Sequence, residues 1–175
     1  MSDDETPPGH AARNQTIWDD RYSEWFGSRA AQQWAAEPHW GIWATPESDL
    51  HVLPDLSGKD VIDLGCGTAY IGAWVMRAGG RPVGIDNSTE QLATAEALQQ
   101  EFGLVFPLIH GNAEQVLLPD NSFDVAISEY GASSWCDPTL WIPEAPATAH
   151  SDHNYVSPEW AATWPTLELW KATRE

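Results

Sequence analysis

The chain has 175 residues and carries 8 Lys and Arg against 26 Asp and Glu, a formal net charge of −18. This length predicts one domain, and an apolar fraction of 42% is enough for a core, so wholesale disorder is excluded. The negative charge argues against nucleic acid and anionic membrane surfaces as partners, because both bind through basic patches.

The beginning of the chain, Met1 to His10, is acidic and lacks the apolar run of a secretory signal. No stretch approaches the roughly 18 apolar residues of a membrane span. The two cysteines, Cys66 and Cys136, are far apart and form no C-x-x-C pair, and the histidines show no H-x-x-x-H spacing. We therefore expect a cytoplasmic chain without structural disulfides and without a metal site.

Four regions of one domain follow one another along the sequence. The first is polar and is predicted to be a mobile tail. The second is rich in tryptophan, with Trp18, Tyr22 and Phe26 at helical spacing, which predicts one or two amphipathic helices. The third is the core, and the fourth is a polar linker with a second tryptophan-rich segment. Their ranges are 1–13, 14–58, 59–145 and 146–175.

Strands and helices alternate in the core region. A helical face over residues 69–78 ends at Gly79-Gly80, and Ser88 with Gln91 forms a capping box for a helix that ends at Gly103. This alternation predicts an α/β fold, a three-layer Rossmann-like parallel sheet with flanking helices. The expected strands are Asp60–Leu64, Arg81–Asp86, Leu104–His110 and Phe123–Ser128.

The turn after the first of these strands carries the most informative pattern. Gly65 and Gly67 allow a sharp turn and a close approach of a ligand to a helix N-terminus, and Asp86 ends the next strand, where a carboxylate can accept hydrogen bonds from ribose hydroxyls. Asp63 would repel the pyrophosphate of a dinucleotide but attract a ligand with a cationic amino-acid end. A nicotinamide-dependent oxidoreductase is therefore disfavoured.

Four motifs in this order resemble the class I S-adenosylmethionine-dependent methyltransferases. They are Asp63-x-Gly65-x-Gly67, Gly84-Ile-Asp86-Asn-Ser-x-x-x-Leu92-x-x-Ala95, Gly111-Asn-Ala-Glu114 and Leu118-Pro-Asp-Asn-Ser-Phe-Asp-Val125, within a likeness that extends from Ile42 to Glu144. The resemblance implies S-adenosylmethionine as cofactor, S-adenosylhomocysteine as product, and a sheet of order 3-2-1-4.

The resemblance also implies roles for single residues. The first motif would hold the methionine part of the cofactor, Asp86 the ribose and Asn87 the adenosine, while Asn112 would accept a hydrogen bond from the adenine amine. Residues 128–130 would border the sulfonium and the substrate. Trp18 and Tyr22 would either cover the cofactor or pack the N-terminal helices, and helix packing is the commoner role of such aromatic residues. The predicted cofactor-binding residues are Trp18, Tyr22, Asp63, Gly65, Cys66, Gly67, Asp86, Asn87, Asn112, Ala113, Glu114 and Glu129. Cys66 would fill space rather than act as a nucleophile, and no catalytic residue is assigned.

The chain departs from the family pattern after the fourth strand, where the late strands of the family sheet are missing. Two functions follow: methyl transfer to a small-molecule or lipid-like acceptor, or an S-adenosylmethionine-binding remnant without activity that acts as a binding or interaction protein. The fourth strand would become an open edge, because Val125, Ala126 and Ile127 carry no protecting charge. The C-terminal tryptophan segment could cover this edge; otherwise we expect self-association or low stability.

Overall fold

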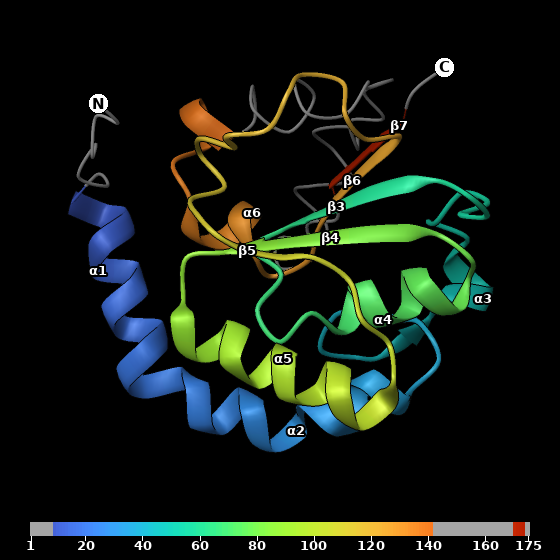
Figure 1. Cartoon of the computed structure of the whole chain (residues 1–175), viewed down its shortest axis with the longest axis horizontal. Coiled ribbons are helices and arrows are strands. Elements are labelled where there is room, and N and C mark those ends of the chain that lie inside the picture. Colours follow the sequence, from blue (N-terminus) through green and yellow to red (C-terminus); the bar gives the residue numbers. More distant parts are fainter. Residues whose placement is uncertain (1–8, 142–169, 174–175) are drawn as a thin grey trace.

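The computed structural model describes residues 9–141 and 170–173. The chain begins with α1 (Gly9–Ile17), a π-helical turn η1 (Trp18–Tyr22) and α2 (Ser23–Ala35), which form one bent helical arm (Figure 1). A two-stranded hairpin follows, β1 (His39–Trp40) with β2 (Thr45–Pro46), and then the short helix α3 (Glu47–Leu50).

The core alternates strands with helices, as its sequence predicts. Its elements are β3 (Asp60–Leu64), α4 (Tyr70–Arg77), β4 (Arg81–Asp86), α5 (Thr89–Phe102), β5 (Leu108–His110), β6 (Val125–Ser128) and α6 (Ala132–Trp135). The parallel strands are ordered β5-β4-β3-β6, which confirms the predicted order 3-2-1-4. The order reverses between β3 and β6, and in open α/β sheets such a switch point is where ligands bind.

Side chains of β3 alternate between the two faces of the sheet. Ile62 and Leu64 pack with Ile85 and Trp141 on one face, while Val61 packs with Trp74 beneath the sheet, on the side of α4. Helix α2 packs outside α4 and α5, as Figure 1 shows, and its Trp34 is fully buried with an indole N–H that donates to Thr68 O at 2.7 Å. Sheet and helices thus make the expected layers.

Three local predictions were wrong. Residues 9–13, predicted as part of a mobile tail, belong to α1, because His10 and Ala11 contact the core. The third strand begins at Leu108 rather than Leu104. The segment before it, up to Pro107, has no regular secondary structure, and Val105 within it is exposed. The fourth strand begins at Val125, two residues later than predicted.

The edge of β6 is not open. Strand β7 (Trp170–Thr173, red in Figure 1) pairs with it antiparallel, with Val125 opposite Thr173 and Ser128 opposite Trp170. The expectation of an open β6 edge was therefore wrong, and its stated alternative, coverage by the C-terminal segment, is the arrangement found. The predicted linker at 146–169 lies outside the described residues. Within the described parts of the chain, no helix is long and apolar enough to cross a membrane.

Candidate functional site

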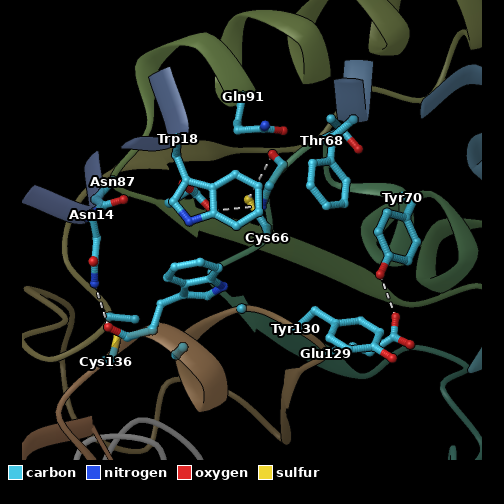
Figure 2. Close-up of a pocket in the computed structure, with 18 of the residues that line it drawn as sticks. Asn14, Trp18, Cys66, Thr68, Tyr70, Asn87, Gln91, Glu129, Tyr130 and Cys136 are labelled. Atoms are coloured by element: carbon cyan, nitrogen blue, oxygen red, sulfur yellow. Dashed lines mark hydrogen bonds between the residues drawn. The ribbon is translucent and has the colours of Figure 1, made fainter. Parts of the chain in front are cut away.

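A cavity of about 440 Å³ lies at the carboxyl ends of the parallel strands. The loops after β3, β4, β5 and β6 all reach it, and α1, η1 and the hairpin β1–β2 close it from the other side (Figure 2). Proteins bind small ligands in cavities of this size, about 300–1,000 Å³. The cavity at the switch point of the sheet is thus the candidate site.

Gly65 and Gly67 serve different purposes in the loop after β3. A Cβ on Gly65 would lie 2.5 Å from Ala132 N and 2.7 Å from Gly131 Cα, so this glycine lets the loops after β3 and β6 pack backbone against backbone. A Cβ on Gly67 would meet only Gln91 Oε1, at 3.7 Å, and would point toward space beside the cavity. Both have positive φ, 77° and 52°. Gly67 alone matches the expected close approach of a ligand.

Asp86 organises the same loop. Its Oδ2 accepts a hydrogen bond from the Gly67 N–H at 2.7 Å, and its Oδ1 accepts one from the Ser88 N–H at 2.8 Å. The predicted capping box is therefore only half formed: the Ser88 hydroxyl oxygen accepts from Gln91 N–H, but Gln91 does not receive the Ser88 N–H. The amide of Gln91 lines the cavity instead, and its Nε2 has no hydrogen-bond partner.

Three carboxyl groups interact electrostatically at this site: Asp86 and Glu129 line the cavity, and Asp63 is buried near them. Burial raises the pKa of Asp63 well above its ordinary value, and the nearby carboxylates of Asp86 and Glu129 raise it further. Burial also raises the pKa of Asp86 and of Glu129. Asp63 Oδ2 is buried without a hydrogen-bond partner. A cationic ligand would relieve this repulsion and favour the charged carboxylates.

The variant D63N tests the acidic cluster. Asp63 keeps its proton in the folded protein over a pH range in which the unfolded chain has released it, so its contribution lowers the free energy of unfolding as pH rises through that range. D63N should remove this part of the slope in urea unfolding measured between about pH 4.5 and 8. If the free energy of unfolding changed with pH in the same way for D63N and for the wild type, Asp63 would already be ionised in the folded protein.

Helix α1 is tied to the cavity by three side-chain hydrogen bonds. His10 Nε2 lies 2.5 Å from Glu114 Oε1, Asn87 Nδ2 donates to Ala11 O at 3.2 Å, and Asn14 Nδ2 donates to Trp135 O at 2.7 Å. Asn112 Oδ1, predicted to accept from an adenine amine, accepts from the Glu114 N–H at 3.0 Å and so has one lone pair left. The loops after β4 and β5 are thus joined to the N-terminal arm.

An aromatic cluster forms one wall of the cavity. Trp18 packs against Tyr22 and Trp135, with ring centroids 5.2 and 5.1 Å away, and Figure 2 shows its indole above the Cys66 loop. Trp18 begins η1, and π-helical turns within helices often lie at functional sites. Asp19 Oδ1, from the same turn, accepts from the Ser88 hydroxyl at 2.6 Å, which fixes the arm on α5.

Ten of the twelve predicted residues line the cavity. Asp63 is buried and does not line it, and Tyr22 packs against Trp18 without lining it. The prediction did not include Tyr70 or Gln91 among the site residues, because their place depends on how separate loops pack, whereas Tyr130, which was predicted to border the substrate, lines the cavity. Burial raises the pKa of the Cys66 thiol, as expected of a packing residue rather than a nucleophile. Among the described residues, no three His, Cys, Asp or Glu side chains could hold a metal together.

Comparison with known proteins identifies similar sequences for the core. Residues 62–146 match the family model described as a methyltransferase domain. Protein arginine N-methyltransferase 1 of Dictyostelium discoideum is 40% identical over 76 residues, which cover 42% of this chain and 22% of that protein. Malonyl-[acyl-carrier protein] O-methyltransferase of Pectobacterium atrosepticum is 33% identical over 88 residues, 50% of this chain and 33% of that protein. The chain spans about a third or less of the length of these two relatives.

Solved structures share the fold. An S-adenosylmethionine dependent methyltransferase from Mesorhizobium loti has a TM-score of 0.51 and 25% identity, over 59% of this chain and 48% of that one. The [4+2]-cyclase SpnF has a TM-score of 0.62 and 22% identity, over 81% of this chain and 57% of that one. The likeness to the cyclase concerns the fold alone.

Proposed function

Residues 62–146 of this chain form a methyltransferase domain, and from that premise we propose that the protein binds S-adenosylmethionine and transfers its methyl group to a small-molecule or lipid-like acceptor. The observation that carries the proposal is the cluster of buried carboxyl groups at the switch-point cavity. S-adenosylmethionine bears an ammonium and a sulfonium, and is the cofactor that this domain implies. The relatives act on chemically different acceptors, so the acceptor class is part of the proposal.

The residues of the cavity fit this cofactor. Asp63 Oδ2 and Gln91 Nε2 are buried polar atoms without partners, and a Cβ on Gly67 would lie 3.7 Å from Gln91 Oε1 with no other atom within 4 Å. We assign the methionine part to Asp63, Gly65, Cys66 and Gly67, and the ribose to Asp86. Asn87, Asn112, Ala113 and Glu114 would lie along the adenine, with Glu129 toward the sulfonium and Trp18, supported by Tyr22, above.

When bound, S-adenosylmethionine supplies a methyl group on a sulfonium, which an acceptor nucleophile displaces in line. The protein contributes chiefly by binding and orientation, because the sulfonium is already activated. Asp86 positions the loop through Gly67 and Ser88. Helix α1 and the aromatic residues Trp18, Phe26 and Trp135 form part of the cavity wall, and Tyr22 packs behind Trp18. No residue is assigned here as a general base.

A second candidate is a protein that binds S-adenosylmethionine without transferring its methyl group. It is favoured by the sheet, in which the only described strand beyond β6 is antiparallel β7. Incubation with methyl-labelled S-adenosylmethionine and a set of amines, alcohols, thiols and carboxylic acids separates the two. Label in an acceptor, absent with the D86A variant, supports transfer. Tight binding without label in any acceptor would contradict transfer to a small molecule and leave the binding function.

A further inference from the structure

Glu129, directly after β6, is held rigidly at the cavity. Its Oε1 accepts a hydrogen bond from the Gly41 N–H at 2.8 Å, and its Oε2 accepts one from the Tyr70 hydroxyl. Figure 2 shows the Tyr70 hydroxyl directed at this carboxylate. These bonds join the hairpin β1–β2, helix α4 and the end of β6 at a single side chain, so the carboxylate has a fixed direction.

Two tyrosine rings flank this carboxylate. Tyr70 is partly buried, and Tyr130 is 41% exposed. Tyr130 has a φ of 52°, a conformation that costs energy for a residue with a side chain and that clusters at functional sites. Its hydroxyl accepts from the Ile42 N–H at 3.1 Å, which fixes the ring at the side of the cavity. Both rings line the cavity with Glu129.

Among the described residues, no Lys or Arg side chain forms an ion pair with this carboxylate. The two hydrogen-bond donors to Glu129, Tyr70 and Gly41, are neutral and favour its charged form, and the nearby His39 favours that form as well. Glu114, by contrast, has His10 beside it, and both oxygens of Asp86 accept backbone N–H groups. Each oxygen of Glu129 keeps a second lone pair, because one donor occupies only one.

We propose that Glu129, positioned by Tyr70 and Gly41, binds the nitrogen of an amine acceptor in its cationic form, with the rings of Tyr70 and Tyr130 at its sides. Before methyl transfer the ammonium loses one proton to water, which frees the lone pair that forms the new N–C bond as the S–C bond breaks. The inference rests on the proposed function and narrows its acceptor class. An amine offers both positive charge and several N–H donors to the carboxylate, and aromatic faces attract cations. An alcohol offers one neutral donor, and a carboxylate would be repelled. Glu129 thus becomes a specificity-determining residue.

Three probes of equal size and different charge test the proposal: benzylamine, benzyl alcohol and benzoate. Their binding is measured by calorimetry on the full chain saturated with S-adenosylhomocysteine. The wild type should bind benzylamine at least tenfold more tightly than either other probe. E129Q keeps the shape and an acceptor oxygen, so it should fold normally. It should lose benzylamine affinity tenfold or more and lose distinctly less affinity for S-adenosylhomocysteine. Y70F should lose less, because the carboxylate remains.

The matched control is E96Q, which removes the same charge from an exposed position of α5 and should change neither affinity. Equal binding of the three probes, no binding of benzylamine, or equal losses of benzylamine and S-adenosylhomocysteine in E129Q would each overturn the acceptor assignment. The last result would make Glu129 a cofactor residue only. If the wild type fails to bind S-adenosylhomocysteine, the proposed function itself fails and the acceptor proposal with it.

Discussion

Replacing Asp86 by Ala is expected to weaken S-adenosylmethionine binding by between tenfold and about 100-fold, since hydrogen bonds to a charged group contribute about 1.5–3 kcal/mol. Two effects combine at this position. The assigned ribose contacts are lost, and the N–H groups of Gly67 and Ser88 lose the oxygens that hold the loops after β3 and β4 together. Calorimetric titration of a variant with a native circular dichroism spectrum measures the loss.

The control for D86A is D120A, which removes a carboxylate from an exposed turn and should leave the affinity unchanged. The intermediate variant D86N keeps one oxygen that can accept a backbone N–H but places an NH₂ group against the second donor. It should therefore bind more weakly than the wild type and no more weakly than D86A. Wild-type affinity in a folded D86A protein would show that Asp86 supports the loop without contacting a ligand.

The second large effect separates the two glycines of the loop. In Gly65→Ala the new Cβ would meet the backbone of Gly131 and Ala132 at 2.5–2.9 Å, at a positive φ. Overpacking costs about 1–3 kcal/mol and the backbone conformation about 1–2 kcal/mol. At about 2–4 °C per kcal/mol for a chain of this size, the melting temperature should fall by roughly 10 °C.

Gly67→Val should show the opposite pattern. Its Cβ meets only Gln91 Oε1, at 3.7 Å, so the fold should lose about 1–2 kcal/mol from the backbone conformation alone. Its branched side chain would occupy the space assigned to the methionine part of the cofactor, and binding should be abolished. Melting curves and titrations of both variants decide the matter. Equal destabilisation by both substitutions would contradict the division of roles between Gly65 and Gly67.

Much of the core was predictable because its signals are local. Each strand, turn and helix between Asp60 and Gly103 is marked by its own apolar period, glycine or cap, and the α/β order follows from their alternation. The loop positions of the site were predictable for the same reason, since the carboxyl ends of parallel strands share one edge of the sheet.

The rest depends on contacts between distant segments, which a local pattern does not record. Trp170–Thr173 pairs with β6 because the edge of β6 would otherwise leave backbone N–H and C=O groups unpaired. Residues 9–13 are helical in a context of long-range contacts, such as the hydrogen bond between His10 and Glu114, which lies 104 residues away in the sequence. Gly65 carries the same signal as Gly67, yet its role is set by Gly131 on another loop. Tyr70 belongs to the cavity for a similar reason.

The most direct test of the account is a calorimetric titration of the full chain with S-adenosylhomocysteine, S-adenosylmethionine and NAD under one set of conditions. The acidic cluster of Asp63, Asp86 and Glu129 predicts binding of the two sulfur ligands, whose amino-acid ends carry an ammonium, and no measurable binding of NAD, whose pyrophosphate the carboxylates repel. Binding of NAD, with no binding of either sulfur ligand, would contradict the assignment of the switch-point cavity to S-adenosylmethionine.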